Sequence, residues 1–81
     1  MNRDEVLELV RSHLAEELEV DVAKIGEGTR FKEDLDADSL DLYELVMELE
    51  DRYGVAVSEE QAGRIETVGD AVSFVVEHTP A

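Results

Sequence analysis

Four aspartates surround one serine in the stretch DLDADSLDLYEL, and these oxygen-bearing side chains could do three kinds of chemistry. The aspartates are Asp34, Asp36, Asp38 and Asp41, and the serine is Ser39. Carboxylates at alternate positions could bind calcium. Paired carboxylates could act as an acid and a base. The serine hydroxyl could instead carry a covalently attached group.

The calcium interpretation meets only half of its motif. An EF-hand loop that began at Asp34 would place Asp36 and Asp38 at its third and fifth positions, as required. Its sixth position would be Ser39 instead of glycine, and its twelfth would be Leu45 instead of a bidentate glutamate. A calcium-binding module therefore remains a remote alternative, and we assign no metal site.

Catalysis is disfavoured because a chain of 81 residues can hardly build a cleft around paired carboxylates. A serine nucleophile also needs a histidine base. The two histidines, His13 and His78, are explained as a partly packed helix residue and as a favourable charge at a helix end. The chain contains no cysteine, no G-x-S-x-G elbow and no glycine-rich phosphate loop. We therefore predict a non-catalytic protein.

The charge balance restricts the partners. Twenty-two acidic residues face seven basic ones, for a net charge of −15. Such a surface repels phosphates, which excludes nucleic acid, and it attracts basic protein patches. No apolar run approaches the roughly 20 residues needed to cross a bilayer, and the first residues do not resemble a secretion signal. We expect a cytoplasmic monomer with no membrane insertion.

The elements that must position these side chains are helices. The spacing of apolar residues predicts an all-α domain over residues 1–81, a small four-helix bundle with three longer helices and one short helix. The longer helices are expected at Arg3–Leu18, at Ser39–Tyr53 and from the Thr67 cap to a point just before Pro80, and the short one runs from the Ser58 cap to Gly63 or Arg64. Residues 19–37 have no period and are expected to form a long ordered loop, with room for one helical turn.

Capping signals support these boundaries. Reciprocal capping boxes are expected for three pairs, Asn2 with Glu5, Ser58 with Gln61 and Thr67 with Asp70. Gly54 is expected to end the helix that begins at Ser39.

The helix after Ser39 has two apolar sides. Its core side is expected to contain Leu42, Leu45, Val46, Leu49 and Tyr53. The residues Leu40, Tyr43 and Met47 recur at i, i+3 and i+7 on another side, which we call the outer stripe. Acidic residues run alongside the outer stripe, and no Lys or Arg occurs between residues 33 and 51. We interpret this side as a docking surface for a basic partner, with burial of both sides by neighbouring helices as the alternative.

Asp38 and Ser39 stand where the loop enters this helix. A phosphate ester on Ser39 would lie beside free backbone N–H groups at the positive end of the helix dipole, a position worth about 0.3–1 kcal/mol to an anion. The alternative is that Ser39 or Asp38 is simply the N-cap.

On these residues the chain resembles an acyl carrier protein, most closely the stand-alone bacterial type of fatty acid synthesis. The resemblance rests on Asp38-Ser39-Leu40 within EDLDADSLDLYELVMELEDRYGV, preceded by TRF and followed by TVGDAVSFV. It covers nearly the whole chain. The three-residue motif alone is weakly specific, but its combination with the loop, the acidic helix and this ending is highly specific.

The resemblance implies that Ser39, flanked by Asp38 and Leu40, carries 4′-phosphopantetheine transferred from coenzyme A by a phosphopantetheinyl transferase. Acyl groups would then travel as thioesters between fatty acid synthesis enzymes with basic docking patches. The implied partner contacts are Asp38, Leu40, Asp41, Tyr43, Glu44, Met47, Glu48 and Asp51. The implied lining of an acyl cavity is Phe31, Leu42, Val46, Ile65 and Val72. A carrier of a stand-alone polyketide pathway remains the alternative.

Two positions depart from the family pattern. Asp36 occupies a place where many members have glycine, and we expect it to accept a left-handed backbone at some cost. Tyr43 is bulkier than the small aliphatic residue that is common there, which could change the choice of partners.

Overall fold

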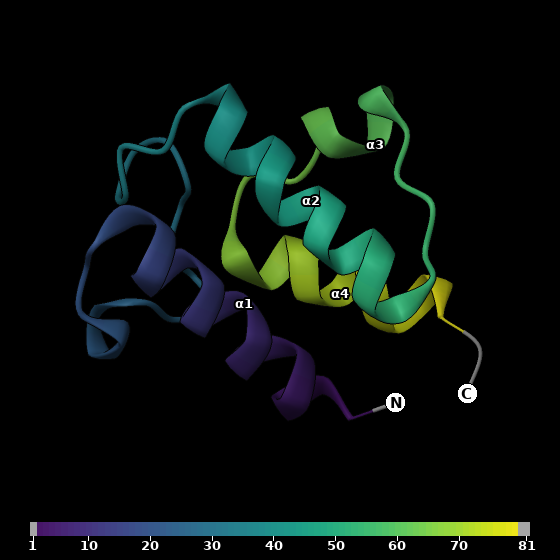
Figure 1. The fold of residues 1–81 in the computed structure, drawn as a ribbon, viewed down its shortest axis with the longest axis horizontal. Helices are drawn as coiled ribbons and strands as arrows, with labels where there is room; N and C mark the ends of the chain where they lie inside the picture. The colour runs from purple at the N-terminus through teal and green to yellow at the C-terminus, as the bar shows by residue number, and fades with distance from the viewer. Residues whose placement is uncertain (1, 80–81) are drawn as a thin grey trace.

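The computed structural model describes residues 2–79, which form helices joined by loops and contain no strand. Its elements in chain order are α1 (Arg3–Leu18), the 3-10 turn η1 (Val22–Lys24), α2 (Ser39–Tyr53), α3 (Glu59–Gly63) and α4 (Val68–His78) (Figure 1). The predicted all-α arrangement of three longer helices and one short one is confirmed. Pro80, expected just after the last helix, lies outside the described residues. None of the helices within residues 2–79 has the length and apolar character needed to cross a bilayer.

The core lies where α1, α2 and α4 meet. Each of these helices contributes side chains that are almost inaccessible to solvent, namely Val6, Val10 and Leu14 from α1, Leu45 and Leu49 from α2, and Val68, Ala71, Val72 and Val75 from α4. Complete burial of one such side chain contributes at most about 1.5–3 kcal/mol. These positions recur at helical spacing, so the periodicity of the sequence identified the core side of each longer helix correctly.

The helix caps follow the sequence signals with one exception. Asn2 caps α1, but its side-chain oxygen accepts a hydrogen bond from the Asp4 N–H at 2.8 Å instead of forming the expected reciprocal pair with Glu5. The other two predicted capping boxes form as expected, between Ser58 and Gln61 and between Thr67 and Asp70. Gly54 ends α2 in the left-handed conformation, as predicted.

The loop between α1 and α2 is held against the start of α4. Three backbone hydrogen bonds connect them, from Phe31 N–H to Glu66 O at 3.0 Å, from Val68 N–H to Thr29 O at 2.9 Å and from Gly69 N–H to Glu27 O at 2.7 Å. Ile25 and Phe31 are buried anchors, and η1 is the helical turn for which the sequence left room. The loop therefore has a defined path toward Ser39.

Gly69 makes the closest of these approaches, and it provides a test of the loop position. A Cβ at this residue would lie 2.9 Å from the Glu27 carbonyl oxygen, so Gly69→Ala must displace the loop. The strain of about 1–3 kcal/mol should exceed the roughly 1 kcal/mol gained in helix propensity. We expect a net fall in the melting temperature of roughly 4–8 °C by circular dichroism.

Gly63→Ala is the matched control for this substitution. Gly63 is the last residue of α3, and a Cβ there would meet no atom within 4 Å. The control variant should melt at the wild-type temperature or slightly above it. If Gly69→Ala behaved in the same way, the close packing of the loop on α4 would be contradicted.

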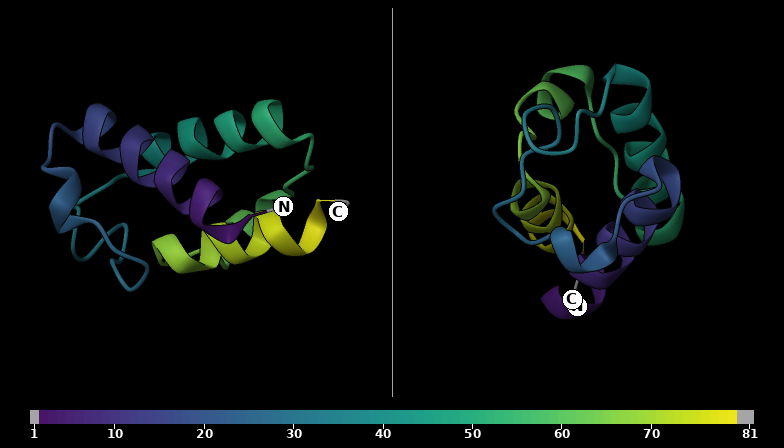
Figure 2. Two further views of the ribbon diagram at one scale, coloured as in Figure 1. Left: turned by 90° about the horizontal axis from the view of Figure 1, so that it is seen from below. Right: turned by 90° about the vertical axis from the view of Figure 1, so that its left-hand side faces the viewer.

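The two ends of the molecule are formed by different elements. The first turn of α1 and the last turn of α4 lie at one end, and the first turn of α2 lies at the other (Figures 1 and 2). The end that contains the start of α2 also contains the long loop and the beginning of α4. Ser39, the first residue of α2, therefore lies at the end of the molecule that contains the long loop.

Candidate functional site

Ser39 is the first residue of α2 and is exposed, while Asp38 is the N-cap. The Asp38 carboxylate accepts a hydrogen bond from the Asp41 N–H at 3.0 Å, and the Asp41 carboxylate accepts one from the Asp38 N–H at 3.2 Å. The cap is thus supplied by the aspartate, and the idea that the serine itself serves as the cap is wrong. The Ser39 hydroxyl is left available for chemistry at the helix terminus.

The backbone just before Ser39 is fixed by two features. Asp36 has a φ of 54°, which confirms the expectation of a left-handed residue at this departure from glycine. Ala37 is buried, and its N–H donates a hydrogen bond to Phe31 O at 2.9 Å. The turn at Asp36 therefore redirects the chain, and Ala37 anchors it to the core two residues before the serine.

The outer stripe of α2 is not covered by any neighbouring helix. Leu40, Tyr43 and Met47 are 66%, 57% and 56% exposed, the largest exposed apolar side chains of α2. The alternative in which neighbouring helices bury both sides of α2 is therefore wrong. The implied acidic contacts border this stripe, with Asp38, Glu44 and Asp51 exposed and Asp41 and Glu48 partly buried.

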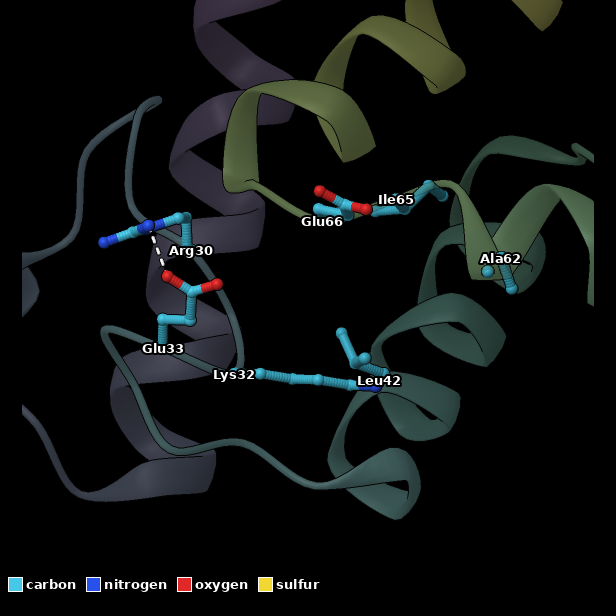
Figure 3. A pocket seen from close by; sticks show the side chains of 8 residues that line it. Arg30, Lys32, Glu33, Leu42, Ala62, Ile65 and Glu66 are labelled. Carbon is cyan, nitrogen blue, oxygen red and sulfur yellow. Dashed lines mark ion pairs between the residues drawn. The ribbon is translucent and has the colours of Figure 1, made fainter.

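Two grooves lie between α2, α3 and the loop. One contains Leu42 and Ile65 (Figure 3), and the other, with a volume of about 350 Å³, contains Ser39, Leu42 and Val46. Two of the expected lining residues, Leu42 and Val46, thus share a groove with the candidate serine, and a third, Ile65, lines the other groove with Leu42. The remaining two, Phe31 and Val72, are packed in the core and line neither groove. Tyr43 borders the groove that contains Ser39 and also belongs to the outer stripe.

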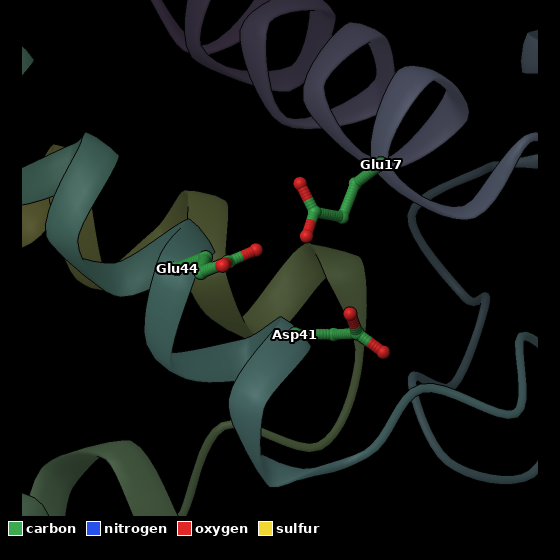
Figure 4. A group of neighbouring side chains, drawn as sticks. All are labelled: Glu17, Asp41 and Glu44. Carbon is green, nitrogen blue, oxygen red and sulfur yellow. The ribbon is translucent and has the colours of Figure 1, made fainter.

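Sequence reasoning missed a contact between α1 and α2. The carboxylates of Glu17, Asp41 and Glu44 lie within 4.8 Å of one another, with Glu17 projecting from α1 toward the two acids of α2 (Figure 4). A hydrogen bond with Glu44 is the largest cause that raises the pKa of Glu17 above 4.5, followed by desolvation and by the negative charges of Glu44 and Asp41. We call these three residues the acidic triad.

The acidic triad should destabilise the fold when it is fully ionised. Because the folded state binds the Glu17 proton more tightly than the unfolded chain does, the repulsion operates above the raised pKa of Glu17 and is relieved as the pH falls through it toward 4.5. Glu17→Gln is therefore expected to raise the melting temperature at pH 7 and low salt by roughly 1–4 °C. The gain should shrink in about 0.5 M salt, which screens exposed charges.

Glu16→Gln makes the same change in net charge one residue away on α1, outside the triad. It should raise the melting temperature less than Glu17→Gln does. Equal gains from the two variants would mean that net charge alone, not the triad, controls the stability.

Comparison with known proteins places this site in a class. Residues 8–75 match the family model described as "Phosphopantetheine attachment site". The helical fold, the exposed serine at a helix start and this match together define a phosphopantetheine-attachment domain.

Individual relatives make the assignment more specific. The chain is 46% identical over 81 residues to an acyl carrier protein of Rubrobacter xylanophilus, with both chains covered completely. It is 42% identical over 78 residues to one of Lactobacillus acidophilus, which covers 96% of this chain and 98% of the relative. A solved structure of acyl carrier protein from Enterococcus faecalis superimposes with a TM-score of 0.84 at 38% identity, covering 98% of this chain and 100% of that one. The chain belongs to the acyl carrier protein family.

Proposed function

We propose that this chain is a non-catalytic carrier that holds acyl groups as thioesters on 4′-phosphopantetheine attached to the Ser39 Oγ. The observation that carries the proposal is an exposed serine in the first turn of α2, in a chain that belongs to this family. Asp38 supplies the N-cap of the helix, so the Ser39 hydroxyl is not needed as a cap. The α2 N-terminus stabilises the negative charge of a phosphodiester. When bound, the prosthetic group supplies the thiol that a chain without cysteine lacks.

The surface of α2 supports successive docking to several enzymes. The outer stripe offers apolar contacts that are ready to be buried, and the bordering acids attract a basic patch and orient it. We propose that the phosphopantetheinyl transferase and the fatty acid synthesis enzymes dock here, through Asp38, Leu40, Asp41, Tyr43, Glu44, Met47, Glu48 and Asp51. Each partner would then meet the same face that presents Ser39.

The grooves beside Ser39 support a resting place for an acyl chain. Leu42, Val46 and Ile65 supply apolar surface there, so a chain turned back from the end of the arm could leave water. Phe31 and Val72 are packed in the core and would line a cavity only if the helices separated.

We propose that the domain extends over residues 1–81 and works as a cytoplasmic monomer without nucleic acid.

The test is loading by a transferase. The purified chain is incubated with coenzyme A, Mg²⁺ and a broad-specificity phosphopantetheinyl transferase, and intact-mass spectrometry should show the gain of one phosphopantetheine. Peptide mapping should place the added mass on Ser39. A chain that gained no mass, or gained it elsewhere, would overturn the proposal.

A second experiment distinguishes the two pathways. Mass spectrometry of the protein from its native source should show reduced acyl chains if it serves fatty acid synthesis, and acyl chains that retain oxygens if it serves a polyketide pathway.

A further inference from the structure

One basic side chain lines the groove that contains Ser39. Lys32 lines both grooves, and in the second it shares the lining with Ser39 itself. Its side chain extends from the loop toward Leu42 on α2 (Figure 3). Leu42 follows Ser39 by three residues in α2, so the two side chains lie on the same face, one turn apart. The Lys32 ammonium thus lies on the side of α2 to which the Ser39 hydroxyl belongs.

The other strong cations of the molecule are engaged or distant. All seven Lys and Arg residues lie within the described part of the chain, and all five arginines form ion pairs there. The pairs are Arg3 with Glu27, Arg11 with Glu8, Arg30 with Glu33 and Asp34, Arg52 with Glu48, and Arg64 with Glu60. The two lysines form none with the described residues, and Lys24 belongs to η1 and lines neither groove.

Arg30 lines the first groove, which does not contain Ser39, and it is committed to its own loop. Its guanidinium pairs with Glu33 and lies 3.4 Å from Asp34, whose carboxylate also accepts a hydrogen bond from the Arg30 N–H at 2.8 Å. That backbone hydrogen bond, followed by the one from the guanidinium, holds the pKa of Asp34 below its ordinary value. To pair with a phosphate on Ser39, Arg30 would have to break these contacts. Lys32 is therefore the available cation beside the serine.

A phosphodiester on Ser39 would need such a cation. Asp36, Asp38 and Asp41 flank Ser39 in the sequence, and the carboxylates of Asp38 and Asp41 cap the same helix start, so the added negative charge lies near other negative charges. The helix N–H groups offset part of this repulsion, and an ammonium group offsets more through a charge-assisted hydrogen bond.

We propose that Lys32 is a positioning residue for the prosthetic group. Its ammonium pairs with the phosphodiester on Ser39 and directs the first part of the arm into the groove between α2 and α3. The proposal rests on the attachment at Ser39 proposed above. The long, flexible lysine stem allows the charge to follow the phosphate while its methylene groups cover the groove beside Leu42. An arm held in this way starts its path toward the apolar groove, where Leu42 and Val46 lie.

The experiment compares wild type with Lys32→Met, which keeps a long apolar side chain and removes the charge. Lys24→Met is the matched control, because it removes the other lysine, which lines neither groove. Each protein is prepared without the prosthetic group and loaded with isotope-labelled 4′-phosphopantetheine, and intact mass confirms loading. Nuclear Overhauser contacts between the arm and the methyl groups of Leu42 and Val46 are then measured in low salt. The melting temperature is measured before and after loading.

In wild type and in Lys24→Met, the arm should contact Leu42 and Val46. In Lys32→Met these contacts should be lost, and the change in melting temperature on loading should be more negative than in wild type by roughly 1–8 °C. Lys32→Arg should restore both results, because it restores the positive charge.

The possible failures are distinguishable. If wild type did not load at Ser39, both the proposed function and the role of Lys32 would be overturned. If all variants loaded at Ser39 but Lys32→Met kept the arm contacts and the wild-type change in melting temperature, only the role of Lys32 would be overturned. Equal losses in Lys32→Met and Lys24→Met would also overturn it, because they would reflect net charge alone.

Discussion

Replacing Ser39 with alanine is expected to abolish phosphopantetheine attachment completely. With the attachment proposed at the Ser39 Oγ, the transfer needs that oxygen as its nucleophile, and alanine supplies none. Folding should be unaffected, because Ser39 is exposed and the cap of α2 comes from Asp38. We therefore expect a change in the free energy of unfolding within about 0.5 kcal/mol. Intact-mass spectrometry after transferase treatment gives the loading, and circular dichroism gives the stability.

Ser12→Ala is the control for this result. Ser12 is an exposed serine on α1, whereas Ser58 caps α3 and Ser73 accepts a hydrogen bond from Arg3, so their removal would disturb the fold as well. Ser12→Ala should load fully. Residual loading of a folded Ser39→Ala protein would show that the attachment point lies elsewhere.

The second large expected effect is that substitutions on the two sides of α2 affect different properties, stability on the core side and docking on the outer stripe. Leu49 is only 2% exposed and belongs to the core, so Leu49→Ala should lower the free energy of unfolding by about 2–5 kcal/mol. The melting temperature should fall by at least roughly 8 °C. Met47 lies two residues away on the outer stripe, and Met47→Ala should change the free energy of unfolding by no more than about 0.5 kcal/mol.

Function should show the reverse pattern. Met47→Ala should raise the KM of the transferase for this carrier by about three- to tenfold, since a buried apolar contact at an interface is worth about 1 kcal/mol or more. Leu49→Ala should load with a KM near that of wild type at a temperature where it is still folded. A Met47→Ala protein with an unchanged KM would remove the outer stripe from the docking surface of this enzyme.

Features that depend on short stretches of sequence could be predicted. The helices, their core sides and the outer stripe follow from apolar spacing within one helix, and Asp36 was placed in the left-handed region by comparison with glycine at the same turn. One local signal misled, because Asn2 can accept equally well from the second or the third N–H of a helix and here bonds to Asp4 instead of completing a pair with Glu5.

Features that depend on two distant stretches could not be predicted. The acidic triad joins Glu17 to residues of α2 that follow it by more than 20 positions, and Lys32 meets Leu42 only because the loop folds back on α2. The acyl-cavity residues illustrate the same limit. Phe31 and Ile65 are both isolated apolar residues in irregular segments and both are buried in the core, yet only Ile65 also lines a groove. The spacing of apolar residues along the sequence does not indicate which of the two borders a groove between elements.

The arrangement of the two ends of the molecule has a practical consequence. Since α1 begins and α4 ends far from the first turn of α2, a purification tag, a fluorescent protein or a tether to a sensor surface could be joined at either terminus without shielding Ser39 (Figure 2). An immobilised carrier would present the start of α2 outward and could be exposed to one enzyme after another. The same geometry would allow the domain to be fused to an enzyme by a flexible linker and still deliver its cargo.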